Sequence, residues 1–161
     1  VRSIDREPSG RLRATSRTLG RGSDRNPTTL GRVSIDLDDL SSEVLAFLAE
    51  RHLATLTTPR PDGTPHVAPV GFTFEPETRL ARIITFRPAR RVANIGTGAR
   101  VALCQVDGAR WLTLEGEATV TDDPERVAEA VRRYATRYRQ PGERDDRVAI
   151  EISVERMMGR G

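Results

Sequence analysis

Lysine is absent from this sequence. All 26 basic residues among the 161 are arginine. Lysine supplies the phosphate-binding ammonium group of P-loop proteins, the Schiff base of pyridoxal phosphate enzymes and most amine nucleophiles. These chemistries are therefore excluded, apart from whatever an N-terminal amine could provide.

Cysteine, histidine and long apolar runs are also scarce. The single cysteine, Cys104, has no partner for an internal disulfide, which favours a buried thiol in a reducing compartment. His52 and His66 form no metal-ligand spacing with it, so we expect no metal. No stretch approaches the roughly 18 apolar residues that span a bilayer, and the first residues lack the apolar centre of a secretory signal. We expect a cytoplasmic protein that binds no membrane.

The positive charge of the chain is concentrated in its first 33 residues. The net charge is +3, but residues 1–33 carry eight arginines against Asp5, Glu7 and Asp24, so the remainder is slightly acidic. This segment has no aromatic residue and few large aliphatic ones, which favours a disordered basic tail over residues 1–35. Nucleic-acid binding by the tail is the weaker alternative, and we expect no nucleic-acid partner. Residues 36–161 then form one domain of ordinary size.

Apolar residues alternate with polar ones along most of this domain. The alternation predicts antiparallel strands, which are separated by Asp-Gly and Pro-containing turns. In the second predicted strand, Pro69 and Gly71 share one face, which indicates a close neighbour or a flat ligand. The predicted strands cover residues 53–58, 66–74, 80–85, 101–106, 111–121 and 148–154.

Three helices are predicted around these strands. Helical spacing of apolar residues indicates one over 40–52, a second runs from the arginines after the third strand to Ile95, and Asp123 caps a third. The third helix has an apolar stripe that ends in Tyr134 and Tyr138. Strands and helices do not alternate, which argues against a doubly wound sheet. The pattern predicts a mainly β domain with peripheral helices, built as a six-stranded, closed or half-closed barrel.

A cationic cluster follows the third predicted strand. Arg87, Arg90, Arg91 and Asn94 stand where a strand ends and a short helix begins. Guanidinium groups and free backbone N–H groups at such a position can bind an anion such as phosphate. A solvated loop in an arginine-rich protein is the other interpretation, and the spacing does not separate the two.

Two stretches carry a family resemblance. Residues 51–85 read RHLATLTTPRPDGTPHVAPVGFTFEPETRLARIIT, and residues 103–120 read LCQVDGARWLTLEGEATV. They resemble the flavin and deazaflavin oxidoreductases with the pyridoxamine-phosphate-oxidase-like, FMN-binding-like split β-barrel. Within that family, the sequence of these stretches is similar to that of the biliverdin reductases that use coenzyme F420. The resemblance covers about residues 40–158, and it implies a homodimer with two cofactor sites across its interface.

The resemblance implies cofactor contacts for a set of residues on the strands and after the third strand. Arg91 occupies the position of the basic residue that binds the cofactor phosphate in the family, and Gln105 and Trp111 are expected to reach the cofactor from the second chain. Further implied cofactor contacts are His66, Pro69, Val70, Ile84, Thr85, Arg87, Arg90 and Asn94.

Some of these residues have simpler alternative roles. Trp111 could instead pack in the core or the dimer interface, Gln105 could satisfy backbone groups, and His66 could be exposed to water. Arg110 is a candidate for binding a substrate carboxylate at the mouth of the cleft.

The resemblance also implies an activity. A hydride would pass from reduced coenzyme F420 to a conjugated acceptor, with biliverdin reduced to bilirubin as the expected reaction. Alignment and positive charge are the protein's contribution, so we expect no obligatory catalytic side chain. The alternatives are an FMN-dependent enzyme similar to pyridoxamine phosphate oxidase, and a protein that binds coenzyme F420 or haem without turnover.

Overall fold

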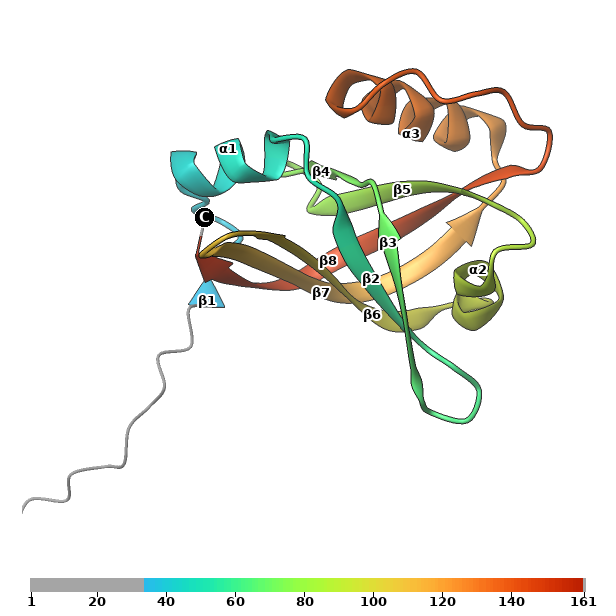
Figure 1. Cartoon of the computed structure of the whole chain (residues 1–161), viewed down its shortest axis with the longest axis horizontal. Helices are drawn as coiled ribbons and strands as arrows, with labels where there is room; N and C mark the ends of the chain where they lie inside the picture. Colours follow the sequence, from blue (N-terminus) through green and yellow to red (C-terminus); the bar gives the residue numbers. More distant parts are fainter. Residues whose placement is uncertain (1–33, 161) are drawn as a thin grey trace, which may run out of the picture. The chain divides into compact units, whose positions relative to one another are not determined.

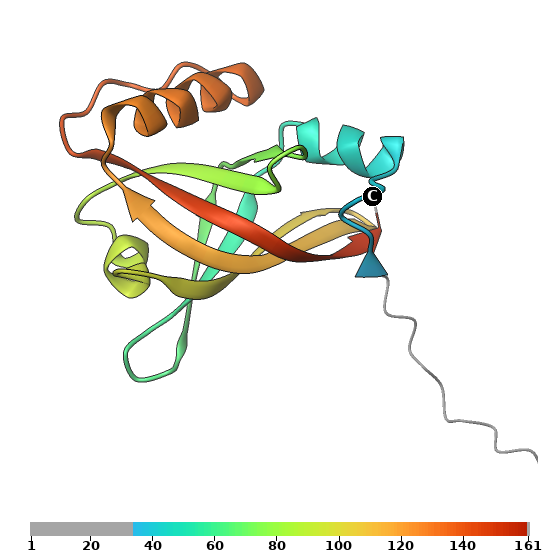
Figure 2. The same ribbon diagram turned by 180° about the vertical axis from the view of Figure 1, so that it is seen from behind.

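Eight strands form one antiparallel sheet that curls on itself (Figures 1 and 2). The computed structural model describes residues 34–160, so the predicted tail over residues 1–33 lies outside the described residues. The strands are β1 (Ser34–Ile35), β2 (Ala54–Pro59), β3 (Pro65–Val70), β4 (Thr73–Glu75), β5 (Leu80–Phe86), β6 (Ala99–Asp107), β7 (Arg110–Thr121) and β8 (Arg147–Arg160).

The order of the strands shows that the sheet is a split barrel. It runs β3-β2-β6-β7-β8-β5-β4, with β1 beside β8, so β3 and β4 lie at opposite ends of the order. Only Gly71 and Phe72 join these two strands. Three Cα steps span at most about 11 Å, so the sheet must curl until its two ends meet. Because β3 and β4 do not pair with each other, the barrel stays open at this junction, which we call the split.

The predicted mainly β architecture with peripheral helices is confirmed, and the structure corrects the number of strands. The single strand predicted over residues 66–74 is wrong, because the chain leaves one edge of the sheet after Val70 and joins the other edge at Thr73. Both Phe72 and Thr73 are buried, so the alternation of faces also stops there. One further strand was not predicted. It is β1 (Ser34–Ile35), which pairs with Met157 and Met158 of β8 and lies inside the predicted tail of residues 1–35.

The inside of the curled sheet is filled by side chains from every long strand. They alternate with outward-facing residues, as the period of two predicts. Burying this apolar surface is the main favourable term in folding. The largest fully buried apolar side chains are Phe47, Phe72, Leu56, Ile83, Ile95, Leu103, Leu112, Leu114, Ile150, Ile152 and Met157.

Three helices cover the barrel: α1 (Ser42–Ala49), α2 (Arg90–Ile95) and α3 (Pro124–Arg137). Figure 1 shows α1 and α3 on the same side of the sheet and α2 between β5 and β6. The Oδ1 atom of Asp123 accepts a hydrogen bond from the backbone N–H of Arg126 at 2.9 Å, which confirms the predicted cap of α3. None of these three described helices is both long enough and apolar enough to cross a bilayer.

The end of α3 supplies the hydrogen bonds that the sheet does not make at the split. The Tyr138 hydroxyl accepts from the backbone N–H of Phe72 at 3.1 Å and donates to the carbonyl oxygen of His52 at 2.7 Å. Arg137 donates to the carbonyl oxygen of Phe72 at 2.6 Å and, through two nitrogens, to that of Glu50 at the end of α1. Buried backbone groups need such partners, so α3 closes the split.

A glycine in β7 allows a close approach that any side chain would prevent. Gly116 lies at a β-bulge against β8, and a Cβ atom there would be 1.9 Å from the carbonyl oxygen of Ser153. We expect Gly116→Ala to lower the free energy of unfolding by about 3 kcal/mol, because the backbone of β8 must move. Urea denaturation measures this change. Gly142→Ala is the control, since no atom lies within 4 Å of its added Cβ, and equal losses in the two variants would contradict the prediction.

Candidate cofactor pocket

A pocket of about 250 Å³ lies beside the split, and we call it the Arg91 pocket. Strands β3 and β5, helix α2, helix α3 and the segment between α3 and β8 all contribute to its wall. The lining residues are Pro69, Val70, Gly71, Ile84, Thr85, Phe86, Arg91, Tyr134, Pro141, Arg144 and Arg147.

Arg91 brings a charge into this pocket without a counter-charge. Its Nε atom donates to the hydroxyl of Thr85 at 3.1 Å, and its side chain is half-buried. Burial lowers the pKa of the Arg91 guanidinium, which nevertheless stays charged at any physiological pH. Within residues 34–160, no carboxylate lies at ion-pair distance from it. An anionic ligand would supply the missing partner.

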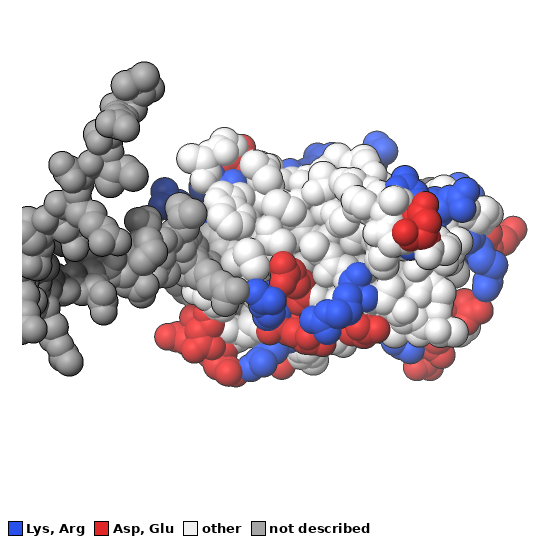
Figure 3. All heavy atoms as spheres, turned by 90° about the horizontal axis from the view of Figure 1, so that it is seen from below, with Lys and Arg blue, Asp and Glu red and all other residues white. Residues whose placement is uncertain are grey.

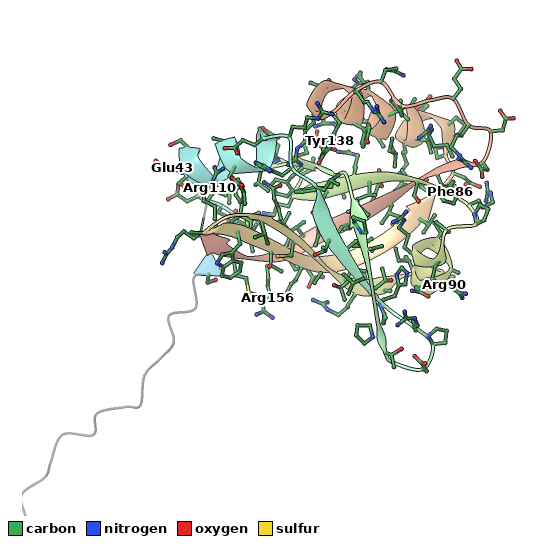
Figure 4. The ribbon with its side chains drawn as sticks, in the orientation of Figure 1. Glu43, Phe86, Arg90, Arg110, Tyr138 and Arg156 are labelled. Carbon is green, nitrogen blue, oxygen red and sulfur yellow. The ribbon has the colours of Figure 1, made fainter. Side chains whose placement is uncertain are left out.

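Two further arginines line the same pocket from the segment after α3. Arg144 pairs with Asp146 through two nitrogens, at 2.8 and 3.0 Å, and its guanidinium lies 4.6 Å from the ring centre of Phe86. Arg147 donates to the carbonyl oxygen of Gly142. Figure 4 labels Phe86, over whose ring the Arg144 guanidinium lies and which pairs with Arg147 in the sheet, and Arg90 on α2. Asp146 offsets the charge of Arg144, so the positive charge at this end of the pocket comes from Arg91 and Arg147.

The other wall of the pocket is apolar. Pro69, Val70 and Ile84 line it, and Gly71 leaves room for the ring of Tyr134. A Cβ atom at residue 71 would be 2.7 Å from the Cε2 atom of Tyr134. The close neighbour indicated by proline and glycine on one face of the strand is therefore α3. A flat ring that carries an anionic group matches the combination of this wall and the cationic end.

The structure brings five of the predicted cofactor residues together. Pro69, Val70, Ile84, Thr85 and Arg91 come from three elements and line one cavity. Their role as cofactor contacts remains a prediction.

His66 and Asn94 do not line this pocket. Both turn to the buried hydroxyl of Thr58, which accepts from Nδ2 of Asn94 at 3.0 Å and lies 3.4 Å from Nδ1 of His66. Their polar groups therefore bind within the protein. The expectation of direct cofactor contact gains no support from this arrangement.

Arg87 and Arg90 are exposed rather than turned into the pocket. Arg87 pairs with Asp122 at 3.0 Å, which lowers the pKa of the Asp122 carboxyl. Arg90 is adjacent to Arg91 on α2, and neighbouring residues on a helix point in different directions. The solvated-loop interpretation thus fits these two arginines, and the anion-site interpretation fits Arg91.

Gln105 is fully buried, and its amide is used inside the protein. Its Nε2 atom donates to the carbonyl oxygen of Phe47 at 2.7 Å, and its Oε1 atom accepts from Arg137 at the same distance. The predicted contact of Gln105 with a cofactor from another chain gains no support, because the side chain has no exposed surface and its amide binds neighbouring protein groups. Trp111 is half-buried on β7, opposite Val106, and lies outside the Arg91 pocket.

Arg110 is held by two carboxylates. It donates to both carboxylate oxygens of Glu50, at 2.8 and 2.9 Å, and to Asp107 at 2.5 Å. The hydrogen bonds from Arg110, and then the one from His52, lower the pKa of the Glu50 carboxyl to about 2. The guanidinium is thus occupied, so the predicted contact with a substrate carboxylate gains no support. Figure 4 shows Arg110 next to α1.

The same ion pairs argue against a metal at this cluster. Glu50, His52 and Asp107 could each offer one ligand atom, and these atoms lie within 4.8 Å of one another. The Arg110 guanidinium already pairs with both carboxylates. A cation would have to displace it, so we assign no metal to these residues.

Gly71, Tyr134, Arg144 and Arg147 also line the Arg91 pocket, and sequence reasoning did not assign them to the cofactor. The sequence pattern indicates only a close neighbour at Gly71, and the apolar stripe of the third helix predicts only packing for Tyr134. Arg144 lies in an Arg- and Asp-rich loop and Arg147 directly follows it at the start of β8, and the sequence pattern there is typical of solvated turns. No local signal shows that this loop meets β3 and β5.

A larger cavity of about 400 Å³ lies between α1, β4 and α3. Its charged side chains, Arg133 and Arg137, already have partners. Arg133 pairs with Glu75 and Glu129, and Arg137 binds carbonyl oxygens. We assign this cavity no ligand.

Comparison with known proteins gives a family and several relatives. Residues 40–160 match the family model described as pyridoxamine 5'-phosphate oxidase. A protein of Mycobacterium tuberculosis named F420H(2)-dependent biliverdin reductase is 52% identical over 120 residues, which are 74% of this chain and 88% of the relative.

Solved structures share the fold at lower identity. A conserved hypothetical protein of Mycobacterium tuberculosis has a TM-score of 0.65 at 22% identity, covering 76% of this chain and 85% of its own. A protein named F420 reductase has a TM-score of 0.61 at 24% identity, covering 73% and 98%. A haem storage protein of Vibrio cholerae has a TM-score of 0.63 at 18% identity, covering 76% and 95%. At these identities the likeness concerns the fold alone.

Proposed function

Since the chain belongs to the pyridoxamine 5'-phosphate oxidase family, we propose that it is an oxidoreductase that binds coenzyme F420 in the Arg91 pocket and reduces a conjugated acceptor. The relative with 52% identity is named for this coenzyme and for biliverdin, which supports the choice of both. Biliverdin is the acceptor we propose.

The uncompensated charge of Arg91 carries the proposal. A half-buried guanidinium without a carboxylate partner is unfavourable unless a ligand supplies the negative charge. Coenzyme F420 has a phosphate and carboxylates, which satisfy this requirement. Arg91 would bind the phosphate as a fork, while Arg147, whose guanidinium donates to a carbonyl oxygen and not to a carboxylate, would attract the remaining anionic groups.

The apolar wall supports the same ligand. Pro69, Val70 and Ile84 offer a surface without charge on which a flat ring can lie, and Tyr134 borders it. When bound in reduced form, the coenzyme supplies the hydride for the reaction. The chain's own residues orient the ring, exclude water from one of its faces and neutralise charge. None of these roles needs a side-chain acid or nucleophile.

We also propose that the protein acts as a homodimer through an uncharged outer face of the sheet. This face consists of residues on β2, β3 and β6 that point away from the core, namely Thr55, Thr57, Val67, Pro69, Ala102, Cys104 and Val106. Val67 is 57% exposed and Val106 is 58% exposed. In Figure 3, charged side chains gather in a band and leave a broad area beside it without charge. Contiguous apolar surface of this kind favours association.

The position of this face relative to the pocket fits a shared cofactor site. Pro69 belongs to the uncharged outer face and also lines the Arg91 pocket. A second copy packed on the face would therefore lie next to the coenzyme. Trp111, opposite Val106 on β7, would lie in or near such an interface.

Turnover tests the proposed activity. Under anaerobic conditions, we expect the protein to oxidise reduced coenzyme F420 when biliverdin is added, and the visible absorption of the oxidised coenzyme reports this. Protein that retains FMN through purification and leaves reduced coenzyme F420 unchanged would point to an FMN-dependent enzyme instead. Tight binding of the coenzyme without oxidation by biliverdin, quinones or nitroaromatics would indicate a carrier.

Arg91→Ala tests the phosphate contact. We expect the dissociation constant for oxidised coenzyme F420 to rise about 10- to 100-fold, because a charge-assisted hydrogen bond is lost. Isothermal titration calorimetry measures the affinity. Arg87→Ala is the matched control, since Arg87 is exposed and pairs with Asp122, and its affinity should change less than about twofold. Unchanged affinity in Arg91→Ala would refute the phosphate role.

Val67→Asp tests the dimer. A carboxylate on the uncharged outer face would be buried without a partner in the proposed interface, so we expect this variant to be monomeric. Analytical ultracentrifugation compares it with the unmodified protein, which we expect to sediment as a dimer. Thr119→Asp, at an exposed position on β7, should remain dimeric. A monomeric unmodified protein would overturn the proposal.

A further inference from the structure

A buried hydroxyl at the end of β2 connects two elements next to the Arg91 pocket. Thr58 has no exposed surface, and its Oγ1 atom accepts a hydrogen bond from Nδ2 of Asn94 on α2 at 3.0 Å. The same oxygen lies 3.4 Å from Nδ1 of His66 on β3. A hydroxyl can accept and donate at once, so one atom links β2, β3 and α2.

Helix α2 depends on such contacts for its position. It has six residues, and Ala89 at its N-terminus provides no side-chain cap. A helix this short is not stable without tertiary contacts. Within residues 34–160, its side chains form two hydrogen bonds to the sheet: Asn94 to Thr58 of β2, and Arg91 to Thr85 of β5. The buried side chain of Ile95 adds the main apolar contact.

The two hydrogen bonds fix the rotation of α2 about its axis. Arg91 and Asn94 are three residues apart, so they lie on the same side of the helix. Their partners stand on β2 and β5, which are not neighbours in the sheet. The buried side chain of Ile95 packs the helix against the barrel, and the two hydrogen bonds orient its polar side. Loss of the Asn94–Thr58 bond would remove one of the two side-chain contacts that orient this side of the helix.

We propose that Thr58 is a positioning residue for cofactor binding: through Asn94 it sets the orientation of α2 and so directs Arg91 into the pocket. The role rests on the proposed function, because it assumes that Arg91 binds the phosphate. It is distinct from direct contact, since Thr58 does not line the Arg91 pocket.

A double-mutant cycle tests the positioning role, with oxidised coenzyme F420 as the probe and calorimetry of the full chain as the measurement. Thr58→Val keeps the shape of the side chain and removes the hydroxyl. We expect its dissociation constant to rise about tenfold, and we expect the same change to have less than about a twofold effect in the Arg91→Ala background. Thr58→Ser should restore the affinity, and Asn94→Ala should reproduce the loss without altering the core.

Other results would overturn the inference. If Thr58→Val weakens binding by the same factor with and without Arg91, the residue acts on the fold and not through Arg91. If Arg91→Ala weakens binding but Thr58→Val and Asn94→Ala do not, the positioning role fails while the proposed function stands. If Arg91→Ala itself has no effect, the phosphate role fails and the positioning role fails with it. Thr119→Val is the matched control and should leave affinity unchanged.

Discussion

The hydrogen bonds from Arg137 and Tyr138 to the split are the constraint on which the rest of the structure depends. At Gly71 and Phe72 the chain crosses between the two edges of the sheet, where no strand can supply partners. Tyr138 binds the N–H of Phe72, and Arg137 binds its carbonyl oxygen. These bonds dock α3 over the split. They also place Tyr134 against Gly71, which forms one side of the Arg91 pocket.

Every basic residue of this chain is arginine, so the position of each positive charge determines which groups it must bind. Lysine can lose its proton when buried, but arginine cannot, so every buried arginine here remains a cation that needs acceptors. Arg137 meets this need with carbonyl oxygens, including that of Glu50 at the end of α1, where the helix dipole is negative. Arg110 meets it with carboxylates. Arg91 has only the hydroxyl of Thr85 as a partner among the described residues, so its charge is available to an anionic ligand in the pocket.

The part of the site that could be predicted is local in the chain. Pro69 and Val70 end one strand, and Ile84 and Thr85 end another, while Arg91 follows in the next helix. The periodicity of the strands and the sequence resemblance to the family therefore both indicate these residues. Arg144 and Arg147 reach the pocket only because β8 pairs with β5, across about sixty residues of chain. The internal roles of Gln105, His66 and Asn94 likewise depend on partners that no spacing in the sequence reveals.

The sequence by itself determined the antiparallel strands, the three helices, the family and the cationic region after β5, because side-chain alternation and turn residues act over short distances. Only the tertiary structure decided that Arg91 lines a pocket without a carboxylate partner, that one predicted strand is two, and that α3 covers the split. Those outcomes depend on which groups remain unpaired after the sheet has curled, and pairing between distant segments is a property of the folded chain as a whole.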